Sequence, residues 1–377
     1  MNGSLPASAR WDMMTGMPAR GAPLPALTGL RFLAALHVVT YHALRPALVD
    51  AAPGPAAFLQ SGPTAVTLFF VLSGFVLVHA YGSAPAPRPF LAARMARLVP
   101  LYWAALALAL PLGLAARARG IVDDPLGAGS LALVATGLQA WVPDAALRWN
   151  PPAWSLSCEL FFYLLFPALV RQVARLGPRG AIVLGAGAWL IGAALPLVYL
   201  ALAPDGLAAP LITDEAPWLN AVKLSPLARL PDFVVGVVAG QLFATGRRVG
   251  AALGLGALLL TLLVAGSGAV PSLVLHNGLL APLFALFIAW LASSAGPLSR
   301  ALSGRALGLL GESSYALYLL HVPLMMWAMA LTRTRALPPS VALVAVGLAI
   351  PLSVVAHLAL ERPARRWLRR RLGADSP

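Results

Sequence analysis

The sequence predicts an all-α polytopic membrane protein, with about ten transmembrane helices in one bundle. Of its 377 residues, 59% are hydrophobic and only 11% are charged, whereas a soluble domain is about half apolar and a quarter charged. The apolar residues also occur in runs of about 20, the length that crosses a bilayer as a helix. Connectors rich in glycine, proline and arginine separate these runs.

Ten segments of this kind follow one another along the chain. They cover residues 27–46, 64–82, 97–116, 154–173, 180–202, 229–245, 249–269, 275–294, 306–330 and 339–360. A further apolar segment, 131–141, is short for a span, and Trp141 and Trp149 flank it. We interpret this segment as re-entrant or interfacial, an arrangement that is tolerated where the backbone lines a cavity.

The distribution of basic residues favours this topology. With ten spans and a cytoplasmic N-terminus, 18 of the 27 basic residues fall on the cytoplasmic side and 8 outside, and cytoplasmic loops do carry an excess of Lys and Arg. A full span at 131–141 would move the basic cluster at 171–179 outside and weaken the bias. We therefore expect a multi-pass protein of the cell inner (plasma) membrane with both termini in the cytoplasm.

The same observations divide the chain and exclude some functions. We expect a disordered cytoplasmic tail at 1–26, one transmembrane domain at 27–367 and a basic cytoplasmic tail at 368–377. Nucleic acid is not expected as a partner, because the residues behind the net charge of +14 lie at helix ends and in short loops. The single cysteine, Cys158, allows no disulfide framework. No metal site and no permanently bound cofactor are expected.

Two polar residues of the first span, Arg31 and His42, predict a functional site. They are eleven residues apart, which on a helix is three turns plus about 20°, so both lie on one face with a rise of roughly 16 Å between them. An ionisable residue inside a membrane-length helix is costly and usually marks function. At this separation the two side chains are too far apart for contact and should do different jobs.

The other intramembrane polar residues fall into an outer and an inner group. His42, Glu159 and Asp232 with Arg229 are expected towards the outer side, and His321 nearer the middle. The inner group consists of Arg31, Arg94, Arg97 and Glu312. An inner basic cluster and an outer cluster of histidine and carboxylates suit a two-sided reaction, with an anionic donor bound inside and proton transfer near the outer face.

Seven motifs in order resemble the acyltransferase 3 family of integral membrane acyltransferases, over nearly all of residues 27–367. The opening motif, LTGLRFLAALHVVTYH (27–42), has the family's arginine, ten residues and then a histidine. The others are FFVLSGFVL (69–77), RMARLVPLYW (94–103), WSLSCELFFYLLFP (154–167), RLPDFVVGVVAG (229–240), LGESSYALYLLHVPL (310–324) and ERPARRW (361–367). Each motif alone is weakly specific, and their order makes the resemblance strong.

The resemblance implies transfer of an acyl group from an acyl-CoA, usually acetyl-CoA, to a hydroxyl of a cell-envelope or exported glycan, or sometimes of a small molecule. His42 would be the catalytic base, Arg31 its partner in the opening motif, and Arg94 with Arg97 the second required element. The protein would thus be an O-acyltransferase that modifies polysaccharide, with acyl-CoA, a glycan acceptor and the lipid bilayer as its partners.

The residue types suit this chemistry. A hydroxyl needs a base as it attacks, and histidine titrates in the right range. Arginine binds the phosphates of CoA in a bidentate manner, and the oxyanion formed from the thioester needs donors, for which Ser155 and Tyr163 are candidates. Glu159 could orient the imidazole of His42 if their helices meet. The remaining polar residues, Asp232, His321 and Glu312, are assigned to substrate binding.

A transporter of a glycan, a lipid-linked sugar or an acyl group is the alternative from another class. Its polytopic fold and intramembrane charges would look the same in the sequence. It also predicts inverted repeats and paired broken helices, which the sequence does not show.

Overall fold

Helices build the protein, as the sequence predicts. The computed structural model describes residues 11–12, 17–18, 20–48, 55–122, 124–334 and 336–372. Two short strands, β1 (Trp11–Asp12) and β2 (Met17–Pro18), pair antiparallel. Parts of the two expected tails, 1–10, 13–16, 19 and 373–377, lie outside the described residues.

The helices follow one another with mostly short connections. In chain order they are α1 (Pro25–Leu48), α2 (Pro55–Gln60), α3 (Thr64–Tyr81), α4 (Pro87–Ala118), α5 (Ala128–Thr136), η2 (Gln139–Trp141), η3 (Pro151–Ala153), α6 (Trp154–Arg175), α7 (Gly177–Leu202), α8 (Pro217–Leu224), α9 (Pro226–Ala244), α10 (Ala251–Gly266), α11 (Ser272–Val274), η4 (Leu275–Leu279), α12 (Ala281–Ser293), α13 (Pro297–Leu302), α14 (Arg305–Glu312), α15 (Ser314–Thr332), α16 (Pro339–Ala356), η5 (His357–Glu361) and α17 (Arg362–Arg371).

The expected count of ten spans is not confirmed. Within the described ranges, eight helical segments are long and apolar enough to cross a membrane, or nine if the bent pair formed by Ser272–Leu279 and Ala281–Ser293 is one span. The two halves of this pair meet at 49°, because Asn277 and Gly278 leave the helical conformation and Gly278 has a φ of +86°. The remaining expected span, 249–269, corresponds to α10, whose 16 residues reach only about 24 Å, less than a hydrocarbon core of about 30 Å.

The segment at 131–141 is short in the structure too. Its helix α5 has nine residues and ends at Gly137, which adopts the left-handed conformation. The turn of η2 then carries Gln139 into the interior, where its side-chain amide donates to the carbonyl of Ala153 at 2.9 Å. The sequence also expects one helix over 306–330, and this region is divided into α14 and α15 at Ser313.

The core centres on α3, which packs against α9 along most of its length. Gly236 and Gly240 form a Gly-x-x-x-Gly pattern on α9, and small residues of this kind let membrane helices approach closely. A β-carbon on Gly240 would lie 2.9 Å from the carbonyl oxygen of Phe75. A β-carbon on Gly74 of α3 would lie 2.5 Å from the carbonyl oxygen of Phe233. The two backbones therefore touch where larger residues would separate them.

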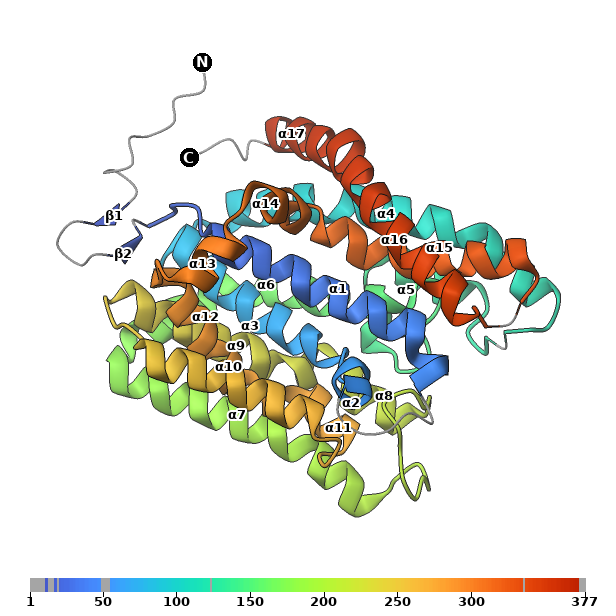
Figure 1. Cartoon of the computed structure of the whole chain (residues 1–377), viewed down its shortest axis with the longest axis horizontal. Helices are drawn as coiled ribbons and strands as arrows, with labels where there is room; N and C mark the ends of the chain where they lie inside the picture. Colours follow the sequence, from blue (N-terminus) through green and yellow to red (C-terminus); the bar gives the residue numbers. More distant parts are fainter. Residues whose placement is uncertain are drawn as a thin grey trace.

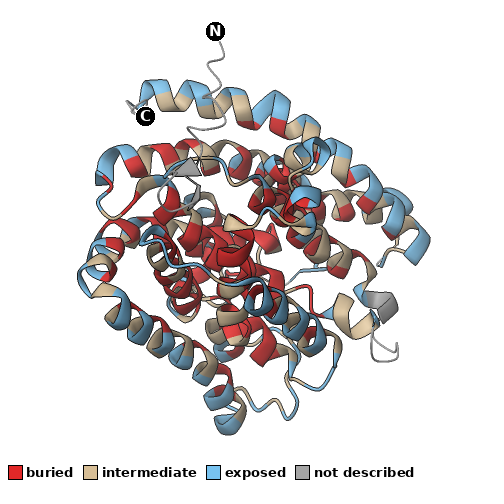
Figure 2. Ribbon diagram, turned by 60° about the vertical axis from the view of Figure 1, so that its left-hand side comes forward, coloured by how far each residue is buried: buried red, intermediate tan, exposed pale blue. Residues whose placement is uncertain are grey.

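Helices α1 and α3 run through the middle of the bundle, α7 and α10 along one edge, and α16 and α17 along the other (Figure 1). Buried residues gather on the central helices, whereas the outer helices show exposed and intermediate residues (Figure 2). Many exposed residues of α7, α10 and α16 are large and apolar, among them Val183, Leu263 and Leu348. Such surfaces are stable in contact with lipid, which supports a multi-pass membrane protein.

Candidate active site

Two adjoining cavities lie within the bundle. The first, here called the arginine cavity, has a volume of about 70 Å³ and is lined by residues that include Arg31, Ser73, Arg97, Ser155, Glu159 and Tyr315. The second, here called the histidine cavity, has a volume of about 270 Å³ and is lined by residues that include Tyr41, His42, Arg45, Trp154, Lys223 and His276. Val66 and Tyr318 line both, so the two cavities meet at these residues.

Helix α1 serves both cavities. Arg31 lines the arginine cavity and His42 the histidine cavity, as expected for side chains on one face at different depths. Two close backbone contacts hold the helix at its Arg31 end. A β-carbon on Gly29 would overlap the carbonyl of Leu302, and one on Gly311 would overlap that of Thr28. These glycines therefore set the position of Arg31 against α13 and α14.

His42 is paired with a second histidine, His321 of α15. Nε2 of His321 lies 3.2 Å from Nδ1 of His42, and the ring centroids are 5.0 Å apart. His321 is completely buried. Three residues before it on the same face, Tyr318 packs with its ring centroid 6.0 Å from that of His321. One turn of α15 thus supplies both His321, the partner of His42, and Tyr318, which lines both cavities where they meet.

The backbone carbonyls around the two imidazoles assign their protons. Nδ1 of His42 lies 3.0 Å from the oxygen of Val38, and Nδ1 of His321 lies 3.2 Å from the oxygen of Leu317. A carbonyl oxygen only accepts, so each neutral ring carries its proton on Nδ1. Nδ1–H of His42 can then also point towards Nε2 of His321, which accepts. This tautomer leaves Nε2 of His42 unprotonated in a residue that lines the histidine cavity.

The arginine cavity holds two guanidinium groups and one carboxylate. In the described part of the chain, the guanidinium groups of Arg31 and Arg97 form no hydrogen bond and no direct ion pair, although Glu159 acts on both electrostatically. Glu159 accepts a hydrogen bond from the hydroxyl of Tyr163 at 3.1 Å. The charges of two arginines exceed that of one carboxylate, so the cavity has unused donors for an anionic ligand.

The structure separates three residues from the partners that the sequence suggests. Glu159 lies in the arginine cavity and not beside the imidazole of His42, whose neighbours are Val38 and His321. Arg94, three residues from Arg97, does not line this cavity. It donates to the hydroxyl of Tyr81 at 2.7 Å. Side chains three residues apart lie on the same side of a helix but still project at an angle to each other, so they can reach different neighbours.

Glu312 is the third of these residues. It lies nine residues before His321 in the sequence but contacts Arg362, and its carboxylate is 3.6 Å from Nε2 of His357. Its side chain is 49% exposed and lines neither cavity. The break between α14 and α15 turns Glu312 away from the interior in which His321 is buried.

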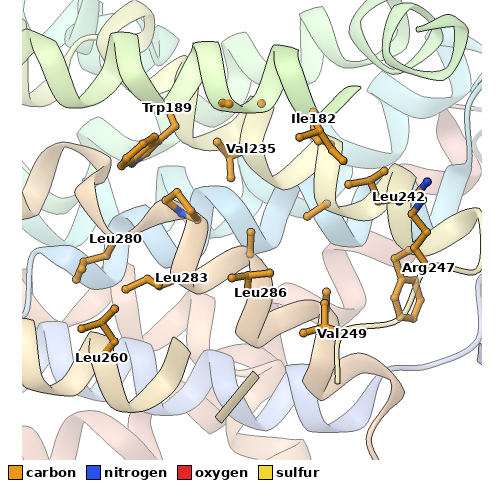
Figure 3. Close-up of a pocket in the computed structure, with 18 of the residues that line it drawn as sticks. Ile182, Trp189, Val235, Leu242, Arg247, Val249, Leu260, Leu280, Leu283 and Leu286 are labelled. Atoms are coloured by element: carbon orange, nitrogen blue, oxygen red, sulfur yellow. The ribbon is translucent and has the colours of Figure 1, made fainter. Parts of the chain in front are cut away.

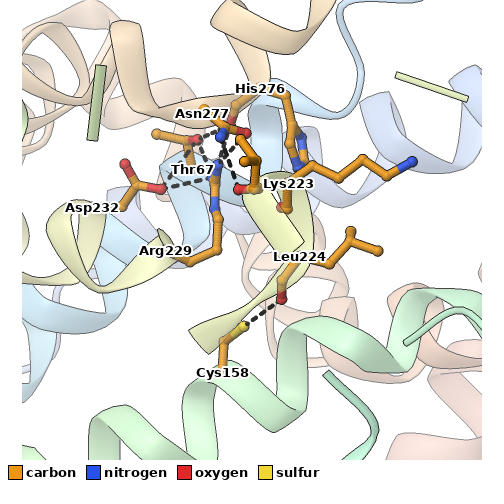
Figure 4. Close-up of polar contacts among 9 residues, drawn as sticks. Thr67, Cys158, Lys223, Leu224, Arg229, Asp232, His276 and Asn277 are labelled. Atoms are coloured by element: carbon orange, nitrogen blue, oxygen red, sulfur yellow. Dashed lines mark hydrogen bonds and ion pairs between the residues drawn. The ribbon is translucent and has the colours of Figure 1, made fainter. Parts of the chain in front are cut away.

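Asp232, which the sequence assigns to substrate binding, belongs to a buried polar cluster (Figure 4). Its carboxylate lies 2.7 Å from the guanidinium of Arg229. Arg229 also donates to the hydroxyl of Thr67 at 2.6 Å and to the carbonyl of His276 at 2.5 Å. Because His276 stands where the bent helix pair opens, the cluster satisfies backbone groups that the bend frees, as a membrane interior requires. His276 itself lines the histidine cavity.

Ser155 and Tyr318 form a polar contact where the cavities meet. Their hydroxyl oxygens are 2.9 Å apart, and each lies 3.1 Å from the carbonyl oxygen of Pro152. Two hydroxyl protons serve three contacts, so one hydroxyl can turn towards a ligand while the other stays bonded to Pro152. Of the residues that sequence reasoning singles out as donors, Ser155 lies at this boundary, and Tyr163 is bonded to Glu159.

Sequence reasoning misses several residues of the site. Tyr318 is the most informative, and its signal is its spacing of three from His321, which places both on one helix face. Arg45 has the same spacing from His42 but was interpreted only as a topology determinant. Lys223 is buried and donates to backbone carbonyls of Ile212 and Asp214 beside the histidine cavity. Nothing local in the sequence marks this lysine.

Chemically, the site can bind an anion, move a proton and stabilise an oxyanion. Two arginines without an ion-pair partner among the described residues, and an imidazole with an unprotonated nitrogen, line two cavities that meet. Among the described residues, no group of three or more His, Cys, Asp and Glu side chains is placed to hold a metal ion. The fold is that of a polytopic membrane protein, and its interior holds the kinds of group that a transfer reaction requires.

Comparison with known proteins identifies the family. A family model described as an acyltransferase domain matches residues 24–358, and the chain belongs to the acyltransferase 3 family of integral membrane acyltransferases. It is 31% identical to the acyltransferase MdmB of Streptomyces mycarofaciens, over 96% of this chain and 97% of the relative. It is 30% identical to the exopolysaccharide production protein ExoZ of Rhizobium meliloti (strain 1021), over 83% and 93%.

A third relative, protein 2 in the picA locus of Rhizobium radiobacter, is 40% identical over 36% of this chain and 75% of its own length. No solved structure matches the chain. The protein is therefore an acyltransferase that is built into a membrane, and the transporter alternative loses its support.

Proposed function

We propose that the protein transfers an acyl group, most simply acetyl, from acyl-CoA to a hydroxyl of a cell-envelope or exported glycan. The observation that carries this proposal is the His42–His321 pair. His42 lines a cavity that adjoins a second one, and the second is lined by two arginines that have no ion-pair partner among the described residues. Acyl-CoA is the donor substrate and not a resident cofactor. The relative named for exopolysaccharide production supports a glycan as the acceptor.

His42 acts as the general base in this proposal. Its unprotonated Nε2 takes the proton of the acceptor hydroxyl as the hydroxyl oxygen attacks the thioester carbon. The imidazolium that forms keeps its Nδ1–H between the carbonyl of Val38 and Nε2 of His321. The carbon–sulfur bond then breaks, and the proton on Nε2 passes to the sulfur of CoA. A positioned base of this kind contributes about 10²–10⁴-fold to the rate.

Arg31 and Arg97 bind the donor. Their guanidinium groups have no ionic partner of their own among the described residues, and phosphate suits their forked geometry. The thioester reaches the boundary between the cavities, where a hydroxyl of Ser155 or Tyr318 stabilises the oxyanion. Glu159 keeps the arginine side chains in place without neutralising both.

The histidine cavity takes the acceptor. Its volume of about 270 Å³ is close to the lower end of small-molecule sites, roughly 300–1,000 Å³. Tyr41, Trp154 and Tyr318 offer aromatic faces for the apolar side of a sugar ring, and Arg45 and Glu215 offer polar contacts. We place the protein in the inner (plasma) membrane with both termini in the cytoplasm, so that CoA enters from the cytoplasm and the glycan from the outer side. This orientation requires an even number of crossings, so in this proposal the bent pair and α10 either both cross the membrane or both do not.

The test is transfer of labelled acetyl from acetyl-CoA to a panel of glycans by the purified full chain. We expect labelled ester on a glycan, loss of turnover by about 10²–10⁴-fold in His42→Ala, and unchanged binding of acetyl-CoA in that variant. His42→Gln should behave like His42→Ala, because an amide does not take the proton.

His37→Gln is the matched control. His37 lies on the same helix, with Nε2 2.8 Å from the carbonyl of Phe58 and its ring stacked on Phe58. It lines neither cavity, so this variant should keep its turnover. Near-normal turnover in His42→Gln would contradict the base assignment, and label on no glycan or other hydroxyl compound would contradict the proposed reaction.

A further inference from the structure

A third cavity lies at the edge of the bundle, away from the proposed active site. It has a volume of about 690 Å³ and is enclosed by α7, α9, α10 and α12. It shares no lining residue with the arginine or histidine cavity. It can therefore take a ligand without touching the groups that carry acyl transfer.

The wall of this cavity is apolar along its length. The indole nitrogen of Trp189 is a polar lining group, and it already donates to the carbonyl of Leu279 at 3.1 Å. Figure 3 shows aliphatic side chains from several helices around the space, among them Val235, Leu260 and Leu283. Apart from the end that holds Arg247 and Arg248, such a wall suits a hydrocarbon chain and offers no hydrogen-bond partners to a sugar.

The length of the cavity matches one leaflet of a bilayer. Its lining residues include Val249, two residues before α10, and Leu260 within α10, and they run from Leu280, the residue before α12, to Ala289. At 1.5 Å per residue, α10 from its first residue to Leu260 and the stretch from Leu280 to Ala289 are roughly 14 Å long each. One leaflet contributes about half of a hydrocarbon core of about 30 Å.

Charge is confined to one end. Arg247 and Arg248 line the cavity where α9 ends and α10 begins, and Trp189, Leu260 and Leu280 lie at the opposite end in Figure 3. Both arginines are exposed. In the part of the chain that the structure describes, neither guanidinium group has an ion-pair or hydrogen-bond partner, and no carboxylate lines the cavity. This end can therefore bind an anion.

The cavity also has a side entrance. Helix α10 packs on α12, with a β-carbon on Gly254 coming within 2.7 Å of the ring of Trp290, and α7 packs on α9. The lining residues Ile182 of α7 and Leu260 of α10 are each 47% exposed. A chain can thus enter between α7 and α10 from the surrounding lipid.

We propose that this cavity is a binding site for an anionic phospholipid of the bilayer, with one acyl chain inside it and the phosphate between Arg247 and Arg248. Basic pockets between transmembrane helices bind anionic head groups in this way. The bound lipid fills the space between α7 and α10, so it stabilises this edge of the protein.

The experiment is native mass spectrometry of the purified full chain in delipidating detergent, with phosphatidylglycerol or phosphatidylcholine added back. We expect one tightly bound phosphatidylglycerol and weaker binding of phosphatidylcholine. The double variant Arg247→Ala, Arg248→Ala should bind phosphatidylglycerol roughly thirtyfold more weakly. Each arginine near the membrane surface contributes about 1 kcal/mol to the binding of an anionic lipid, and the loss of both corresponds to this factor in affinity. Arg300→Ala with Arg305→Ala is the matched control and should bind it normally, because Arg300 of α13 and Arg305 of α14 do not line this cavity.

A second pair of variants tests the apolar part. Ala186→Trp places a large ring in the cavity, since Ala186 lines it, and should displace the lipid. Val183→Trp adds the same ring to an outward position of α7 that is 72% exposed and should not. Equal binding of the two lipids, or unchanged binding in both the double arginine and Ala186→Trp variants, would overturn the proposal. So would a dimer that buries this face, or preferential binding of a polyprenyl phosphate.

Discussion

Nε2 of His321 lies 3.2 Å from Nδ1 of His42, across the contact between α15 and α1. The carbonyls of Leu317 and Val38 make His321 the acceptor in this pair. His321 lines neither cavity itself, so we expect it to act as a positioning residue that orients the proposed base. This task is comparable to that of the group that holds the imidazole in other acid–base sites.

We predict that His321→Leu lowers kcat by roughly 10²-fold, the effect of a small misplacement of a catalytic group. His321→Gln should recover part of the loss, because its amide oxygen can accept from Nδ1–H of His42. The pH profile of kcat should also move, since the imidazolium of His42 loses a partner. Equal kcat in His321→Leu and the parent protein would contradict this role, and normal acetyl-CoA binding separates it from misfolding.

The two arginines of the Arg-x-x-Arg element, Arg94 and Arg97, should contribute differently to the binding of acyl-CoA. Arg97→Ala should weaken acyl-CoA binding by about 10–100-fold, as for a lost charged hydrogen bond. Arg94→Ala should weaken it less, because Arg94 is bonded to Tyr81 and lies outside the arginine cavity. Arg97→Lys should recover binding only in part, since an ammonium lacks the bidentate fork. Isothermal titration with CoA measures all three.

If Arg94→Ala proves as damaging to CoA binding as Arg97→Ala, the donor extends beyond the arginine cavity. A useful comparison is Arg171→Ala, because Arg171 donates to the carbonyl of Pro85 at 3.3 Å and lines neither cavity. This variant should bind CoA like the parent protein.

Membrane topology can be tested with single cysteines. Arg175→Cys and Arg247→Cys should react only with a thiol reagent that reaches the cytoplasm, and Asp214→Cys with one that stays outside. The only native cysteine, Cys158, is completely buried, so the parent chain should remain unlabelled. Labelling of Asp214→Cys from the cytoplasm would refute the proposed orientation.

Asp124, in the connection after α4, should make stability depend on pH. Burial by itself raises the pKa of Asp124, but hydrogen bonds from Ser130 and Arg117 and the charge of Arg117 outweigh this and lower it below its usual value. The folded protein thus binds this proton less readily than the unfolded chain. The stabilisation is complete above the ordinary pKa of about 3.9 and is lost as the pH falls through the lower folded value.

Asp124→Asn should lower the melting temperature at pH 7 by roughly 2–4 °C and by less at pH 3, where the parent protein has lost part of the same interaction. Scanning fluorimetry at both pH values measures the difference. Asp144→Asn is the control, because within the described residues the carboxylate of Asp144 forms no ion pair. An equal shift at both pH values would show that the charge of Asp124 is not responsible.

The glycines at the contact between α3 and α9 should be required for the stability of the protein. A β-carbon on Gly236 would overlap the carbonyl of Val71, so Gly236→Ala should destabilise the protein by about 1–3 kcal/mol, the usual cost of overpacking. Gly187 of α7 has open space at the same position, and Gly187→Ala should be neutral or stabilising by about 0.5–1 kcal/mol. Comparison of the two melting curves tests the close approach directly.

The fold class and most helices follow from the sequence alone, because they depend on local properties. A run of about 20 apolar residues must form a helix in a bilayer, since lipid offers no other partner for the backbone. The shared face of Arg31 and His42 follows from helix periodicity, and the ordered motifs indicate the family that the comparisons confirm. The assignments of His42 as base and of acyl-CoA as donor stay predictions.

Tertiary structure alone decided which of these residues meet. His42 and His321 are 279 positions apart, and no local pattern distinguishes that contact from one between His42 and Glu159. The bend at Asn277 and Gly278 and the break at Ser313 depend on how helices pack, which apolar runs do not reveal. Packing also turned Arg97 into the cavity and Arg94 towards Tyr81. Side-chain direction within a helix is local, but the neighbour on that side is set by distant parts of the chain.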